Sequence, residues 1–113
     1  MRVDELAVAL RKREALLARC LFAQFHDVDP RDIEEPALPS ALDRAIAASV
    51  VELLAERTGR SAPSWTARVA PLPNEFVLVT VRLPEKLARL RQETPRALRV
   101  RNLVAPESFL CAV

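Results

Sequence analysis

Arginines near the carboxyl end of the chain are the side chains whose type and spacing point most directly to a function. Arg96, Arg99 and Arg101 stand within the stretch TPRALRVRN, and Arg89 precedes them. Arg96 and Arg99 are three residues apart and share one face of a helix, whereas Arg101 falls off that face. A guanidinium binds carboxylate or phosphate through two parallel hydrogen bonds, so the cluster predicts contact with an acidic partner protein or with nucleic acid. The alternative is that these arginines only solvate a last helix and complement its negative end.

Asn102 and Trp65 are two further candidates for contact with a partner. Reading of bases requires Asn, Gln or aromatic side chains near the arginines, and only Gln92 and Asn102 qualify, so nucleic acid is the weaker expectation. Trp65, in APSWTA, lies outside any helical apolar pattern. It is either an interface anchor or a loop tryptophan folded over the core with its indole N–H bound to a carbonyl.

The side chains that usually carry catalysis are few and scattered. His26 is the only histidine, and Cys20 and Cys111 have no second Cys or His at ligand spacing. A phosphate-binding loop needs several glycines, and the chain has one. The sequence therefore predicts no catalytic residue, no metal site and no cofactor. Both cysteines are expected to be buried or half-buried thiols.

Composition predicts one small helical domain. The chain has 113 residues, of which 50% are hydrophobic and 28% charged, and Ala and Leu favour helices. Net charge is only +2, but residues 81–113 hold seven basic residues against three acidic ones, which suggests nucleic-acid contact or head-to-tail pairing with another chain. No run approaches the roughly 18 apolar residues of a membrane span, and the N-terminal stretch carries acids that a signal peptide lacks. We therefore expect a cytoplasmic protein with no membrane contact.

Helix signals divide the single domain, residues 1–113, into two regions. Residues 1–35 predict one long helix from Asp4 to about Phe25, with an apolar stripe, and then an acidic connection rich in proline. In residues 36–113, Ser40 predicts the start of a second long helix, and Gly59 predicts its end. The first stripe consists of Leu6, Leu10, Leu17 and Leu21, widened by Leu16, Cys20 and Phe25.

The rest of the second region is more ambiguous. FVLVTVRL, residues 76–83, favours a strand over Phe76 to Arg82 because it is rich in β-branched residues, with a helix or extended chain as the alternative. A lone strand would have to pair across a dimer, so a homodimer is compatible with this pattern. Short helices are predicted from Pro84 to about Glu93 and from Thr94-Pro95 through Arg101.

The resulting fold prediction is mainly all-α: two long helices packed antiparallel, shorter C-terminal helices, and at most one short strand. In the last helix, Arg96 and Arg99 are expected to be exposed. Leu98 lies on a different face from the two arginines, and the apolar residues expected to be buried are Leu98, Leu103, Phe109 and Leu110.

Three stretches carry a family resemblance: ALDRAIAASVVELLAERTGRSAPSWT, PLPNEFVL and LRQETPRALRVRNLVAPESFL. They resemble the C-terminal domain of small, mostly actinobacterial helix-turn-helix regulators and antitoxin-like proteins, over about residues 40–113. In toxin–antitoxin members of that family the companion gene often looks like a nucleotidyltransferase. The recurrent positions of the family fall here on Trp65, Arg96, Arg99, Arg101 and Asn102. The first 35 residues lack the turn glycine and polar helix starts of a repressor-like domain, so the helix-turn-helix itself is missing here.

The resemblance implies a non-enzymatic bacterial protein that binds and neutralises a companion protein, as the antitoxin or regulatory subunit of a toxin–antitoxin module. Two alternatives stay open. One is a transcriptional regulator that binds nucleic acid through the C-terminal arginine cluster, and the other is an accessory subunit of an enzyme. The candidate partner-binding residues are Arg89, Arg96, Arg99, Arg101, Asn102 and Trp65.

Overall fold

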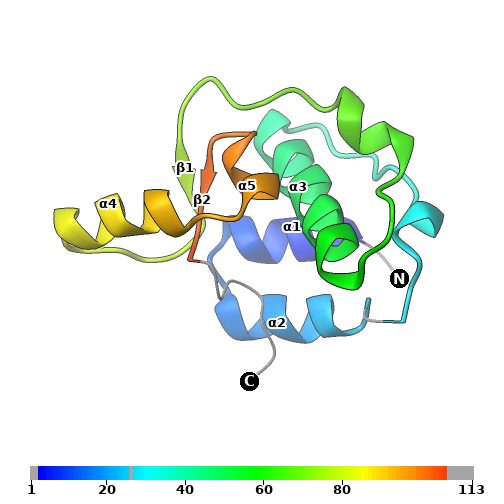
Figure 1. Ribbon diagram of the computed structural model, residues 1–113, viewed down its shortest axis with the longest axis horizontal. Coiled ribbons are helices and arrows are strands. Elements are labelled where there is room, and N and C mark those ends of the chain that lie inside the picture. The colour runs from blue at the N-terminus through cyan, green and yellow to red at the C-terminus, as the bar shows by residue number, and fades with distance from the viewer. Residues whose placement is uncertain (1–2, 26, 107–113) are drawn as a thin grey trace.

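The computed structural model describes residues 3–25 and 27–106, and it is mainly helical, as predicted (Figure 1). None of the helices in these ranges is long and apolar enough to cross a membrane. The elements in chain order are α1 (Val3–Arg11), α2 (Ala15–Ala23), η1 (Pro30–Asp32), α3 (Ala41–Thr58), η2 (Ser64–Arg68), β1 (Phe76–Val77), α4 (Pro84–Glu93), α5 (Arg96–Arg99) and β2 (Leu103–Val104).

Helix α3 is the centre of the core, and both of its predicted ends are confirmed. The Ser40 hydroxyl accepts a hydrogen bond from the Asp43 backbone N–H at 3.4 Å, and Gly59 adopts the left-handed conformation (φ 66°) that ends the helix. Helices α1 and α5 and the turns η1 and η2 pack around α3 (Figure 1). Because it is enclosed on most sides, α3 buries small side chains such as Ala45, Ala47 and Ala48 beside larger ones.

The prediction of a single helix from Asp4 to Phe25 is wrong, because the chain breaks between α1 and α2. Arg13 has a positive φ of 58°, and the Glu14 N–H donates to the Ala9 carbonyl at 2.9 Å while the Arg13 N–H donates to Leu10 at 3.0 Å. This hydrogen-bond pattern ends many helices, and the left-handed position in it, here Arg13, is usually occupied by glycine. Contacts beyond the helix hold the arginine there: its Nε donates to the Val77 carbonyl at 3.2 Å.

The break changes which side chains of the second half are buried. Leu6 and Leu10 in α1 are buried as predicted, but Leu16 and Leu17 in α2 are 75% and 47% exposed. Helix α2 instead buries Ala18 and Phe22. The expectation of a buried or half-buried Cys20 is also wrong, since this thiol is exposed on α2. Cys111 lies outside the described residues.

The acidic connection between α2 and α3 is held to the core by its apolar residues. Ile33 is buried and Leu38 is half-buried against the core, as expected. Asp29 caps η1 by accepting the Arg31 backbone N–H at 3.0 Å. The pKa of Asp29 is lowered, mainly because the Arg31 side chain donates hydrogen bonds to its carboxylate.

The predicted strand forms over only its first two residues, and its partner lies within the same chain. Strand β1 pairs in parallel with β2, with Phe76 opposite Leu103 and Val77 opposite Val104. The pairing ends where the Leu78 N–H donates to the Val104 carbonyl at 2.9 Å. The short sheet therefore does not require a second copy of the chain.

The last helix is shorter than predicted, but its burial pattern is as expected. Helix α5 covers Arg96–Arg99 and stops before Arg101. Leu98 and Leu103 are buried, whereas Arg96 and Arg99 are exposed. Phe109 and Leu110, the other two residues of that prediction, lie outside the described residues.

Candidate partner-binding surface

Two of the six candidate residues are part of the interior. Trp65 is 6% exposed, and its indole N–H donates to the Ile33 carbonyl at 2.8 Å. This hydrogen bond joins η2 to the acidic connection. It corresponds to the structural alternative considered for this tryptophan, a loop residue folded over the core.

Arg101 is the second interior residue. It is 5% exposed, forms an ion pair with Glu52 of α3, and donates hydrogen bonds to the backbone carbonyls of Thr66 and Val69. One guanidinium therefore joins α3, η2 and the end of α5. The sequence offered a signal for this difference, because Arg101 does not share the helical face of Arg96 and Arg99.

Asn102 forms hydrogen bonds that hold the two strands together, although the residue as a whole is exposed. Its φ of 63° is in the left-handed region, which asparagine tolerates better than most residues. Its carbonyl accepts the Phe76 N–H at 2.9 Å, and its side-chain amide donates to the Leu72 carbonyl. The residue thus places β1 beside β2.

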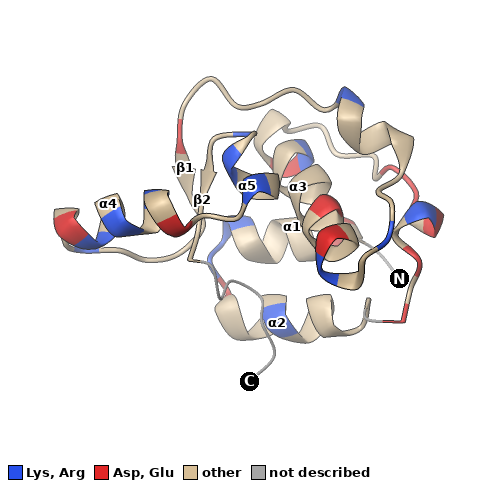
Figure 2. Cartoon of the chain, viewed as in Figure 1, with Lys and Arg blue, Asp and Glu red and all other residues tan. Residues whose placement is uncertain are grey.

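The other three candidates, Arg89, Arg96 and Arg99, lie on the outside of α4 and α5. Arg99 also has a structural contact, since its Nη2 donates to the Thr94 carbonyl at 2.8 Å. Arg89 and Arg96 form no ion pair with any described residue. Blue residues recur along α4 and α5 in Figure 2, and the acidic connection lies at the opposite side of the molecule.

Helix α4 projects from the body of the protein. None of its ten residues is buried, and Figure 1 shows it extending away from α1, α3 and α5. We call residues 78–93 the arm: the chain that leaves β1, runs out, and returns as α4. Pro84 begins the helix, and the helix ends before Pro95 because a residue that precedes proline avoids helical geometry.

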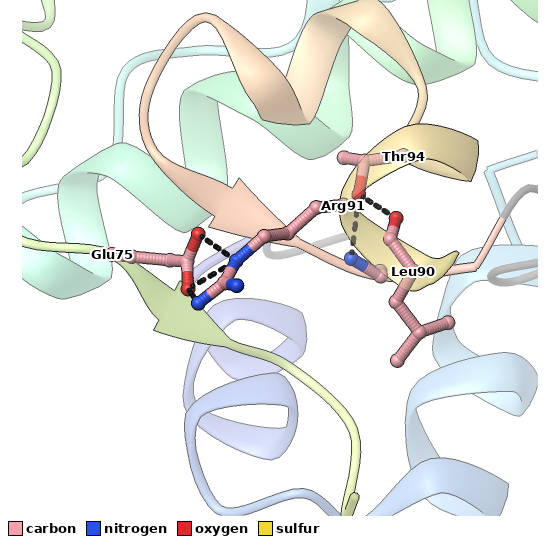
Figure 3. Close-up of polar contacts among 5 residues, drawn as sticks. Glu75, Leu90, Arg91 and Thr94 are labelled. Atoms are coloured by element: carbon pink, nitrogen blue, oxygen red, sulfur yellow. Dashed lines mark hydrogen bonds and ion pairs between the residues drawn. The ribbon is translucent and has the colours of Figure 1, made fainter. Parts of the chain in front are cut away.

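Two contacts fix the base of the arm, and both are drawn in Figure 3. Glu75, next to β1, accepts hydrogen bonds from Arg91 Nη2 at 2.9 Å and Nε at 3.0 Å. The hydroxyl of buried Thr94 donates to the Leu90 carbonyl at 2.6 Å and accepts the Ala105 N–H at 3.3 Å. The pKa of Arg91 is raised, first by its hydrogen bonds with Glu75 and then by the carboxylate charge.

A groove of about 640 Å³ runs between the outgoing chain of the arm and α4. Its apolar wall is valine and leucine, and its charged lining includes Arg82, Lys86 and Arg89. Of these three, only Arg89 was predicted from the sequence as a partner-binding residue. The alternation in FVLVTVRL would have pointed to the apolar wall, but nothing in the sequence placed it against α4. The lining residues are Val79, Thr80, Val81, Arg82, Leu83, Lys86, Arg89 and Leu90.

Clustered metal ligands do not occur in residues 3–25 and 27–106: no three His, Cys, Asp or Glu side chains there are placed to hold an ion. His26 lies outside these ranges. No family model, curated protein or solved structure matches the chain. The likeness to antitoxin-like regulators therefore rests on the sequence motifs that carry it.

Proposed function

We propose that this chain is a non-enzymatic bacterial protein of the cytoplasm that works by binding a companion protein. In this proposal it is the antitoxin or regulatory subunit of a toxin–antitoxin module, and it neutralises a nucleotidyltransferase-like companion by direct contact. The contact surface is the arm together with the exposed side of α5.

One observation carries the proposal: basic side chains gather on an element that the fold does not use for its core. Arg82, Lys86, Arg89 and Arg96 are exposed and form no ion pair with any residue in the described part of the chain. Three of them stand on the arm, whose helix buries none of its residues. A projecting element contributes little to burial in the free chain, so its side chains are available for a second molecule.

An acidic surface is the natural counterpart of these side chains. A guanidinium pairs with a carboxylate through two hydrogen bonds, and such pairs gain strength when the interface excludes water. If the acidic surface is a cleft whose carboxylates hold a metal ion, the arginines compete with the metal or with the phosphates of its substrate. Inhibition then follows from binding and requires no chemistry by this chain.

Co-expression with the product of the adjacent gene tests the proposal. The test variant is Arg89→Glu/Arg96→Glu, which leaves Arg99 and its hydrogen bond to the Thr94 carbonyl in place. We expect the companion to co-purify with the wild type, and the double variant to bind at least tenfold more weakly. Exposed charges contribute little to the fold, so the melting temperature should change by no more than about two degrees.

The matched control is Arg19→Glu/Arg60→Glu, which makes the same charge change at exposed residues of α2 and the segment after α3. This variant should bind and inhibit like the wild type. A companion that is activated instead of inhibited would make the chain an accessory subunit. Full binding by the Arg89/Arg96 variant, or no binding by the wild type, would contradict the proposal.

Nucleic-acid binding is the second candidate, because the same four basic side chains, which have no ion-pair partner in the described chain, could contact phosphates. Binding through phosphate contacts releases counterions, so the logarithm of the affinity falls linearly with the logarithm of salt concentration, by about 0.9 per contact on duplex DNA. A slope of about 3 to 4 that drops by about 2 in Arg89→Glu/Arg96→Glu would favour this candidate. A shallow slope that is the same in both proteins would eliminate it.

A further inference from the structure

The outgoing chain of the arm has the sequence of a strand, but only Phe76 and Val77 form one. Residues 76–83 have the β-branched composition of a strand, yet backbone pairing with β2 stops at the Leu78 N–H. From Val79 to Arg82, no backbone N–H or C=O forms a backbone hydrogen bond with any described residue. Four consecutive residues therefore present unused donors and acceptors, and such an edge is a template for pairing with another chain.

The side chains of this segment alternate as they do in a half-buried strand. Val79 and Val81 are half-buried, and Thr80 and Arg82 are exposed. The two valines line the groove beside α4, where Leu83 (52% exposed) and Leu90 complete its apolar wall. A strand laid along this segment would therefore find both backbone partners and an apolar groove for alternate side chains.

The charge around the groove selects what can lie in it. Arg82, Lys86 and Arg89 line it, and none of them has an ion-pair partner among residues 3–25 and 27–106. The carboxylate of Glu75 is already paired with Arg91, and the two carboxylates of α4, Glu85 and Glu93, do not line the groove. Three basic side chains without an ion-pair partner in the described chain, beside an apolar groove, complement a segment that carries both apolar and acidic residues.

We propose that the companion protein inserts an extended, acidic segment into this groove, where it adds a strand to Val79–Arg82. This inference rests on the proposed function and names the element of the companion that is recognised. Backbone hydrogen bonds to alternate residues supply affinity, apolar side chains of the segment enter the groove, and its carboxylates pair with Arg82, Lys86 and Arg89.

Other occupants fit the same features less well. A second copy of the arm would place the positive charges of these side chains opposite one another, and like charges repel. A helix would fill the apolar groove but would leave the backbone groups of Val79–Arg82 unpaired. Single-stranded nucleic acid binds through aromatic stacking, and no aromatic side chain lines the groove. A bilayer surface does not supply a strand to pair with the unused N–H and C=O groups of Val79–Arg82.

Selection from a display library of random dodecapeptides on the full chain tests the inference. We expect the enriched peptides to alternate Asp or Glu with Val, Ile or Leu, and to bind at least tenfold more weakly to Leu83→Glu and to Lys86→Glu/Arg89→Glu. Two controls make the same changes elsewhere and should bind like the wild type: Leu16→Glu on the exposed face of α2, and Arg19→Glu/Arg60→Glu. A circular dichroism melt of each variant separates loss of binding from loss of folding.

Two measurements distinguish an added strand from an added helix. Bound peptide should slow amide hydrogen exchange at alternate residues between Val79 and Arg82. N-methylation of the peptide should abolish binding when it falls on one set of alternate residues and leave binding intact on the other set, because only one edge of the added strand faces the chain. Equal loss from both sets would indicate a helix and would overturn the inference.

Further outcomes would also overturn it. These are the enrichment of neutral or basic peptides, the enrichment of none, binding that survives Leu83→Glu, or stronger binding to anionic lipid vesicles or RNA than to the acidic peptides. If the companion still co-purifies under any of these outcomes, the proposed function stands without this inference. If acidic peptides bind in the groove but no companion is found, the site stands and the antitoxin role fails.

Discussion

At the scale of single residues, arginines within six positions of one another have different roles. Arg96 is exposed without an ion-pair partner in the described chain, Arg99 donates to the Thr94 carbonyl, and Arg101 is buried against Glu52. The difference arises because α5 ends after Arg99, and the chain then turns into the core before β2 begins. Adjacent arginines therefore cannot be treated as one basic patch.

Replacement of Arg101 by Met should destabilise the protein strongly. Met retains much of the side-chain volume but leaves Glu52 without its cation and the carbonyls of Thr66 and Val69 without their donor. Breaking a buried ion pair from one side typically costs about 3 kcal/mol or more in the free energy of unfolding. Urea denaturation of Arg101→Met measures this change.

Arg96→Met is the matched control, because it makes the same replacement at an exposed arginine. Its free energy of unfolding should stay within about 0.5 kcal/mol of the wild type. Equal effects of the two substitutions would show that Arg101 does not hold α3, η2 and the chain after α5 together.

At the scale of elements, the turn between α1 and α2 decides how the N-terminal region packs. Arg13 stands at the left-handed position of the turn, its guanidinium lies 5.0 Å from the centre of the Phe76 ring, and its Nε donates to the Val77 carbonyl. These contacts join the end of α1 to β1. They offset part of the cost of about 1–2 kcal/mol that a side chain incurs in the left-handed conformation.

Comparison of Arg13→Gly with Arg13→Ala tests the turn without interference from the lost guanidinium contacts. Both variants lose those contacts, but only Ala retains a Cβ at positive φ. We therefore expect the Gly variant to be more stable than the Ala variant by about 1 kcal/mol. Chemical denaturation of the two variants measures the difference.

The same pair of substitutions at Arg19 supplies the control, because Arg19 is an exposed residue in the middle of α2. There the sign should reverse, with Ala more stable than Gly by about 1 kcal/mol, since glycine weakens a helix interior. If Ala were the more stable residue at position 13 as well, the chain would run as one helix through this point.

At the scale of the whole molecule, the body and the arm are stabilised differently. The body packs α1, α5, η1 and η2 around α3, and it uses fully buried alanines so that these elements approach α3 closely. Beyond Leu78 and Val79, which contact the core, the arm is outside it and is attached at its base by the Arg91–Glu75 pair and by Thr94. Added volume should therefore be tolerated in the arm and not in the body.

Ala48→Leu and Ala88→Leu make the same change in the two parts. Ala48 of α3 is completely buried, so the larger side chain must displace its neighbours, and we expect a loss of about 1–3 kcal/mol in the free energy of unfolding. Ala88 of α4 is exposed and should accept leucine within about 0.5 kcal/mol. Thermal melts of both variants check the contrast, and a destabilised Ala88→Leu variant would mean that α4 packs against the body.

The sequence by itself determined the features that depend on neighbouring residues. The helical class follows from Ala and Leu content, and both ends of α3 follow from the hydroxyl of Ser40 and from Gly59, the one residue that adopts positive φ without steric cost. The exposure of Arg96 and Arg99 and the burial of Leu98 follow from helical spacing within one short segment.

Only the tertiary structure decided the features that depend on contacts between distant residues. An arginine at positive φ is unfavourable locally, and it is held at position 13 by contacts with Phe76 and Val77, more than sixty residues away. The burial of Arg101 requires Glu52, and the pairing of β1 requires β2. At position 13 the local preference is worth about 1–2 kcal/mol, which is small enough for a few long-range contacts to override.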